Sequence, residues 1–173
     1  MPASVISCID RELVRSALRT VHRLRNIGAT IVTAESCTAG LISAVLAQAE
    51  GASEVLQGSF VVYSKNQKHA ALGVDVELLS AHGAVNADVA EQMLSGALAR
   101  SKATLGLAVT GVLGPEEDED GNPVGLVIFC VGRAGESCRT ETRSYGNRPH
   151  EQLQHRVVLE GLELLESTAL SER

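Results

Sequence analysis

The stretch Thr-Ala-Glu-Ser-Cys-Thr-Ala-Gly at residues 33–40 constrains the fold of this chain more than any other. Residues 28–33 predict a short buried strand, because β-branched and small apolar residues follow a glycine. Residues 41–47 predict an apolar helix. The stretch is therefore expected to be a strand-to-helix turn, where the first backbone N–H groups of the helix lack partners and the positive end of the helix dipole lies.

This turn places two hydroxyls and a thiol, those of Ser36, Thr38 and Cys37, where an anion would be stabilised. One interpretation is that Ser36 or Thr38 is simply the N-cap of the helix, a position that these residue types favour. The other is that Ser36 is a nucleophile on an elbow, with backbone amides ready to form an oxyanion hole.

The rest of the chain alternates between helical and strand patterns. Its 173 residues are expected to form one domain, residues 1–173. Aromatic residues make up only 2% of the chain, so Ala, Val, Leu and Ile must build the core, which suits close packing of helices on a sheet. Helices are predicted near residues 10–26, 75–81, 87–101 and from about 150 to 168, and strands near 55–63, 103–110, 124–132 and 136–145.

Charge and cysteine usage narrow the function classes. The net charge of -6 disfavours nucleic acid as the main partner. The four cysteines show no C-x-x-C spacing, so we expect neither a zinc site nor a redox dithiol but a reduced cytoplasmic protein. No signal peptide and no apolar run long enough for a membrane span is recognisable, so we expect a soluble protein without a membrane partner.

A tyrosine and a lysine are predicted to converge after the strand at residues 55–63. If Ser64 caps the next helix, Lys68 lies one turn in and can point back toward Tyr63 at the strand end. The alternative is an ordinary solvated helix start with surface lysines.

A glycine loop and an arginine are candidates for holding a phosphate. Thr110, Gly111 and Gly114 follow a predicted strand, and the two glycines let the backbone approach a ligand such as a phosphate or ribose. Five consecutive acids at residues 116–120 would repel a phosphate, and their default interpretation is a solvated loop tip. Arg148, just before the last helix, is either part of a phosphate clamp or a surface charge.

Short motifs distributed along the chain resemble a known family. They lie at residues 34–40, 60–64 with Lys68, 73–74, 82–85, 110–115, 123–125 and 146–148. Over about residues 10–167 they resemble, in order and spacing, the C-terminal domain of the competence/damage-inducible protein CinA. That family has a three-layer α/β/α sandwich around a mixed sheet, in agreement with the alternation above. Its stand-alone members hydrolyse the carboxamide of nicotinamide mononucleotide to nicotinic acid mononucleotide and ammonia.

The resemblance implies roles for individual residues. It makes Ser36 the nucleophile and Lys68 its base, with Tyr63 orienting or relaying the proton. The amides of Cys37, Thr38 and Ala39 would hold the oxyanion. No cofactor or metal is required, and the expected partners are a small nucleotide substrate and a second copy of the chain in a homodimer.

Three positions depart from the family pattern. The usual T-G-G is Thr38-Ala39-Gly40, the usual alanine of the glycine loop is Leu113, and Glu116-Glu117 replaces glycines. Ala39 could narrow the oxyanion hole if it needs a conformation that glycine prefers. The alternatives are an amidase of another small carboxamide, a non-catalytic nucleotide-binding or protein-interaction module, and an enzyme whose nucleophile is Cys37.

Overall fold

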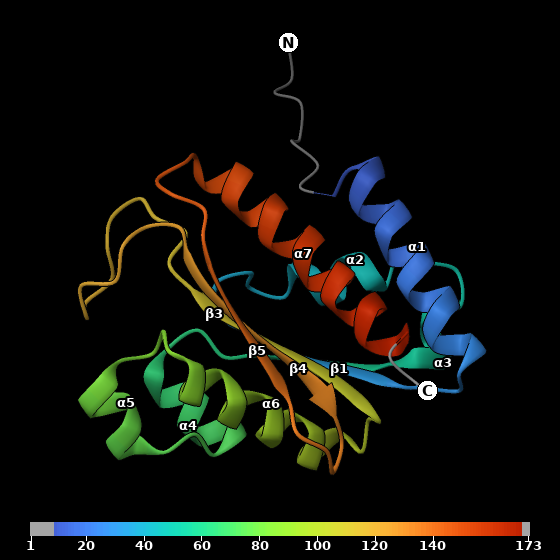
Figure 1. Cartoon of the computed structure of the whole chain (residues 1–173), viewed down its shortest axis with the longest axis horizontal. Helices are drawn as coiled ribbons and strands as arrows, with labels where there is room; N and C mark the ends of the chain where they lie inside the picture. Colours follow the sequence, from blue (N-terminus) through green and yellow to red (C-terminus); the bar gives the residue numbers. More distant parts are fainter. Residues whose placement is uncertain (1–8, 171–173) are drawn as a thin grey trace.

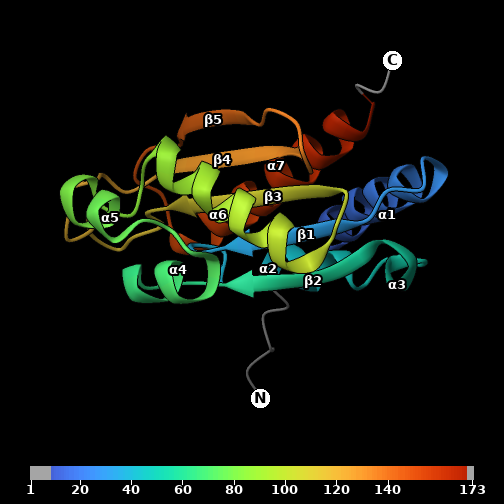
Figure 2. The ribbon, with the colours of Figure 1, turned by 90° about the horizontal axis from the view of Figure 1, so that it is seen from below.

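The structure, a computed structural model, describes residues 9–170. A five-stranded sheet with the order β2-β1-β3-β4-β5 forms the middle layer, and helices cover both of its faces (Figures 1 and 2). β1 pairs in parallel with β2 and β3, whereas β4 is antiparallel to both β3 and β5. The predicted α/β/α sandwich around a mixed sheet is therefore confirmed. The strands are β1 (Ile31–Glu35), β2 (Leu56–Val61), β3 (Leu105–Gly111), β4 (Leu126–Arg133) and β5 (Arg139–Ser144).

The helices divide between two apolar cores, one on each face of the sheet. Helices α1, α2, α3 and α7 pack on one face, and α4, α5 and α6 on the other (Figure 1). None of the helices between residues 9 and 170 is long and apolar enough to cross a bilayer. Their bounds are α1 (Arg11–Asn26), α2 (Leu41–Leu46), α3 (Ala52–Val55), α4 (Lys65–Leu72), α5 (Val76–His82), α6 (Ala87–Ser101) and α7 (His150–Leu170).

Two predicted boundaries differ from the structure around the central strand. β1 begins at Ile31 instead of residue 28, because Ala29 N–H still donates to the Leu24 carbonyl and closes the end of α1. The strand predicted from residue 55 begins at Leu56, directly after the short helix α3, which was not predicted because a single helical turn is too short to show a helical period.

The alternation of side chains along β1 decides which groups enter which core. Ile31 packs in the core beneath α1, α2 and α7, whereas Val32 and Ala34 pack in the core beneath α6. Glu35 is four residues after Ile31 and therefore points to the same face as Ile31, toward α2. The parallel pairing also brings the carboxyl ends of β1, β2 and β3 to one edge of the sheet, the usual place of ligand sites in such folds.

Close packing between α4 and α6 sets the position of α4. A Cβ atom added to Gly96 of α6 would lie 2.0 Å from the Leu72 carbonyl oxygen of α4. Only glycine allows this approach, so Gly96 determines how near α4 lies to the sheet edge where β1 ends.

Candidate active site

Ser36 and Lys68 meet at the edge of the sheet where β1 ends. Lys68 Nζ lies 2.7 Å from Ser36 Oγ. The Ser36 N–H donates to the Val109 carbonyl at 3.0 Å, which ties the residue after β1 to the neighbouring strand β3. Ser64 caps α4 as predicted and leaves Lys68 one turn into the helix. The pair is buried, because Ser36 is 6% and Lys68 1% exposed.

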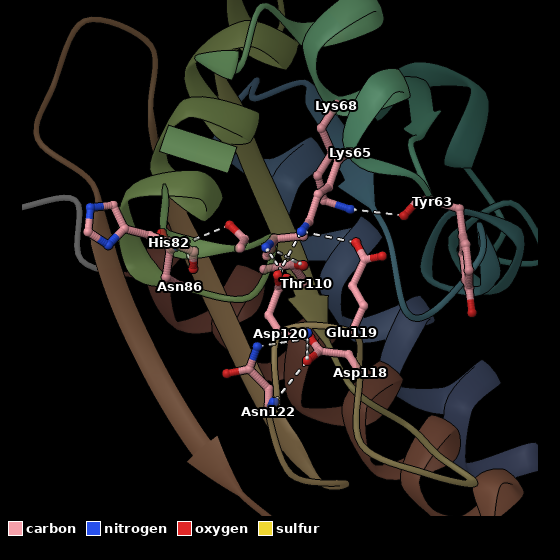
Figure 3. Close-up of polar contacts among 12 residues, drawn as sticks. Tyr63, Lys65, Lys68, His82, Asn86, Thr110, Asp118, Glu119, Asp120 and Asn122 are labelled. Carbon is pink, nitrogen blue, oxygen red and sulfur yellow. Dashed lines mark hydrogen bonds and ion pairs between the residues drawn. The ribbon is translucent and has the colours of Figure 1, made fainter. Parts of the chain in front are cut away.

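The surroundings of Lys68 favour its neutral amine over its ammonium form more than in an ordinary exposed lysine. Its Nζ also donates to the Val62 carbonyl oxygen at 3.0 Å and to the Tyr63 carbonyl oxygen at 3.2 Å. Figure 3 shows the contact with Tyr63. Burial disfavours the ammonium form and lowers the pKa of Lys68 from 10.5 to about 8. When the amine is neutral, two N–H groups can serve the two carbonyls while the lone pair faces the Ser36 hydroxyl. This arrangement lets Lys68 accept the proton of Ser36.

Tyr63 makes a different contribution from the one predicted. Tyr63 is 74% exposed, and its ring points away from Lys68 in Figure 3. Within residues 9–170 its hydroxyl forms no hydrogen bond to Ser36 or Lys68, and it is the backbone carbonyl of Tyr63 that contacts Lys68. The predicted role of Tyr63 in orienting or relaying the proton therefore has no support from its side-chain position.

The interpretation that Ser36 or Thr38 caps the helix is wrong. Helix α2 begins at Leu41, and its N-cap is Gly40 with φ of 90°. Glycine has no side chain, so the N-cap residue gives no side-chain hydrogen bond to the first turn of α2. The carboxylate of Glu35 takes that place from the end of β1. It accepts hydrogen bonds from two amides of the first turn, Ile42 N–H at 3.0 Å and Ser43 N–H at 2.8 Å.

Glu35 is a site residue to which the sequence argument gave no role. It is fully buried, and it also accepts hydrogen bonds from the hydroxyls of Thr38 at 2.7 Å and Thr33 at 3.0 Å. A carboxylate at the amino end of α2 neutralises the helix dipole there, so this helix end is not the free anion site that was expected. The available signal was its place at the end of a strand, on the same face as Ile31 and Thr33.

The predicted oxyanion donors reduce to one candidate. The Ala39 N–H donates to the Ser36 carbonyl at 3.0 Å, so it is already used in the turn. Ala39 has φ of 51°, the left-handed conformation that glycine prefers. Thr38 is 1% exposed and does not line the cavity beside Ser36. Cys37 does line it, and its amide meets no acceptor oxygen in the part of the chain that the structure describes.

The thiol of Cys37 is unsuited to be the nucleophile. It packs in the core on the α1 side of the sheet, and burial raises its pKa to about 12. A thiol of that pKa carries almost no thiolate at neutral pH.

A cavity of about 650 Å³ opens over Ser36 and Lys68, within the range of small-molecule sites. The predicted loop residues Thr110, Gly111 and Gly114 line it. The Thr110 hydroxyl donates to the Ala84 carbonyl at 2.9 Å, so it serves the fold. A Cβ added to Gly111 would lie 2.7 Å from the Leu126 carbonyl oxygen, so β4 itself requires this glycine.

The acidic loop at residues 116–120 is exposed except at the half-buried Asp118, as expected of a solvated loop tip, but it also lies beside Ser36 and Lys68. All five acids line the cavity. Lys65 Nζ lies 3.0 Å from a Glu119 oxygen and 2.7 Å from an Asp120 oxygen, and the Ala84 N–H donates to Asp120 at 3.3 Å (Figure 3). The Asp118 carboxylate accepts hydrogen bonds from the backbone of Asp120 and from Asn122. These contacts hold the loop at the mouth of the cavity.

Arg148 lies outside this cavity. Its Nε donates to the Tyr145 carbonyl at 3.0 Å, and it borders a separate hollow with Glu151 at the start of α7. From this segment it is His150 that lines the cavity, with Nδ1 3.2 Å from the Leu113 carbonyl oxygen. The structure therefore does not bring the predicted phosphate clamp to Ser36.

A group of possible metal ligands lies away from the cavity. Oxygens of Asp10 and Glu12 and a nitrogen of His155 lie within 4.8 Å of one another at the surface. Asp10 caps α1 through its other contacts, to the amides of Glu12 and Leu13. These residues are explained by their structural role.

Comparisons with known proteins agree with this geometry. The CinA C-terminal domain model matches residues 14–169. A CinA-like protein of Mycolicibacterium gilvum is 48% identical over 122 residues, which cover 70% of this chain and 29% of that protein. A CinA-like protein of Acidobacterium capsulatum is 38% identical over 145 residues, or 84% of this chain and 34% of that protein. The chain thus spans about a third of the length of these curated relatives.

Solved structures extend the likeness to the whole fold. The competence/damage inducible protein CihA of Agrobacterium tumefaciens superimposes with a TM-score of 0.88 at 34% identity, covering 94% of this chain and 99% of that one. The competence damage-inducible protein A of Klebsiella pneumoniae has the same TM-score at 28% identity, covering 93% and 99%. With its fold, its Ser36 motif and a family model over residues 14–169, the chain belongs to the CinA C-terminal domain family.

Proposed function

We propose that this chain is an amidohydrolase that cleaves a carboxamide to a carboxylic acid and ammonia, with Ser36 as nucleophile and Lys68 as general base. One observation carries the proposal: a buried lysine, whose pKa burial lowers to about 8, lies 2.7 Å from a buried serine on the wall of a cavity. A serine hydroxyl is a poor nucleophile until a base accepts its proton, and a lysine of lowered pKa can do so.

In the first half of the reaction, neutral Lys68 accepts the Ser36 proton while Ser36 Oγ forms a bond to the carboxamide carbon. The negative charge moves to the carboxamide oxygen, which the Cys37 amide can stabilise. A donor of this kind contributes about 2.7 to 4 kcal/mol to the transition state. The Lys68 ammonium then gives its proton to the amide nitrogen, the C–N bond breaks, and ammonia leaves an acyl-Ser36 ester.

In the second half, Lys68 is neutral again and can accept a proton from water. The resulting hydroxide attacks the ester carbon, the bond to Ser36 Oγ breaks, and Lys68 returns the proton to Ser36. Net hydrolysis consumes one water and needs no redox partner. The carbonyls of Val62 and Tyr63 hold Lys68 in one orientation throughout.

Nicotinamide mononucleotide is the first substrate to test, because the sequence motifs resemble a family that deamidates it. Ammonia release is measured for the wild type, Ser36→Ala and Lys68→Met, with Ser53→Ala on the exposed surface of α3 as a matched control. Both site variants are expected to lose at least about 10³-fold in kcat, and the control to retain it.

The same assay separates the alternatives. Turnover of another small carboxamide that disappears in Ser36→Ala, with none of the mononucleotide, would keep the mechanism and change the substrate. Saturable binding without ammonia release from any carboxamide would contradict the enzyme proposal and favour a binding module.

A further inference from the structure

We propose that the acidic loop at residues 116–120 makes this cavity select a carboxamide that is cationic and carries no phosphate. The inference concerns the ligand of the site and rests on the proposed function for the identity of the reacting group. It follows from the charges that line the cavity and from which of them are already paired.

Negative charge dominates the lining of the cavity. Five carboxylates face two ammonium groups, those of Lys65 and Lys68. Lys68 contributes no charge when it is the neutral base that the proposed mechanism requires. The excess of negative charge therefore grows in the state of the protein that reacts.

The side chains that could hold a phosphate are already engaged. Lys65 forms ion pairs with both Glu119 and Asp120. The His150 ring lies against the Leu113 carbonyl, and Arg148 borders another hollow. Within residues 9–170, no lysine or arginine on the cavity wall is left for a phosphate.

Glu116 and Glu117 supply the repulsion. Both line the cavity, both are exposed, and neither forms an ion pair with another described residue. Their negative charges raise the free energy of a bound phosphate and lower that of a bound cation, because like charges repel and opposite charges attract over several ångströms. The reacting carboxamide is itself neutral, so it does not contribute to this preference.

Two probes differ only in the group at issue. Nicotinamide riboside has a positively charged ring and no phosphate, whereas nicotinamide mononucleotide adds the phosphate to the same ribose. Their dissociation constants are measured by calorimetry on the full chain carrying Ser36→Ala, so that no ligand is consumed. The test variant adds Glu116→Gln and Glu117→Gln.

A control variant removes the same two negative charges from the other end of the sheet. Glu50 precedes α3, and Glu136 lies in the β4–β5 turn. This turn is at the end of the sheet where β3 begins, because Arg133 pairs there with Leu105. Neither glutamate lines the cavity. Glu50→Gln with Glu136→Gln in the Ser36→Ala protein therefore reports the effect of net charge alone.

The expected result is tighter binding of the riboside than of the mononucleotide, by at least about tenfold at low ionic strength. The loop variant is expected to reduce that ratio about tenfold, and the control less than about twofold. At 0.5 M salt the effect of the loop variant should shrink, because salt screens exposed charges.

Equal affinities, tighter binding of the mononucleotide, no measurable binding of the riboside, or an unchanged ratio in the loop variant would each overturn the inference. Failure of the proposed function looks different. It would show as binding with the expected preference, together with no ammonia release from either ligand by the protein that retains Ser36.

Discussion

Replacing Glu35 by glutamine should destabilise the fold by about 3 to 5 kcal/mol, although the two side chains have the same shape. One Glu35 oxygen accepts from Ile42 N–H at 3.0 Å and the other from Ser43 N–H at 2.8 Å. Both donors are backbone amides at the start of α2 and cannot turn away. Glutamine has one oxygen and one NH2 group, so in either orientation its NH2 group faces one of these amides.

The magnitude follows from two losses. One backbone amide is left buried without an acceptor, which costs about 1 to 3 kcal/mol. The remaining hydrogen bonds lose their charged acceptor, so each falls from about 1.5 to 3 kcal/mol to about 0.5 to 1.5 kcal/mol. The hydroxyls of Thr33 and Thr38 can rotate to adapt, so they add little.

Urea unfolding followed by far-ultraviolet circular dichroism measures this change, a suitable signal because the chain has no tryptophan. The matched control is Glu54→Gln, which removes a carboxylate that is 58% exposed and paired with Arg25. That surface ion pair is worth at most about 1 kcal/mol. A loss below about 1 kcal/mol in Glu35→Gln, equal to the control, would refute the argument that Glu35 replaces the helix cap.

The other predictions concern the base, the packing and the thiol. Because only neutral Lys68 can accept a proton, kcat/KM should rise about tenfold per pH unit below pH about 8 and level off above it. The variant Lys68→Arg should abolish this rise. A flat pH profile of the wild type from pH 6 to 9 would contradict the role of Lys68 as the base. Gly96→Ala should force α4 away from α6, because the new Cβ would meet a backbone oxygen of α4 at 2.0 Å. We expect it to lower the free energy of unfolding in urea by about 1 to 3 kcal/mol and to lower kcat. The control Ser95→Ala, on the exposed side of α6, should change neither quantity. Cys37→Ala keeps the amide and removes a buried thiol, so ammonia release should stay within about threefold of the wild type; loss of turnover would reopen Cys37 as the nucleophile.

Much of the framework was predictable because it rests on local properties of the chain. Helical and strand periods placed α1, α6 and the strands within a few residues of their observed bounds. The Ser64 cap set Lys68 one turn into α4. The predicted strand-to-helix turn placed Ser36 directly after the strand that is β1. The motifs also carried the family, and with it the layered architecture.

The resemblance already implied that Lys68 is the base for Ser36, but the contacts that bring the two side chains together came only with the tertiary structure. Ser36 meets Lys68 because β1 lies between β2 and β3 and because Gly96 lets α4 approach, and both depend on packing between distant segments. The capping role of Glu35 depends on α2 folding back over β1. Periodicity and capping act within a few residues and can be deduced from the order of residue types, whereas strand order, helix approach and the pairing of charges are decided by the free energy of the whole packed chain.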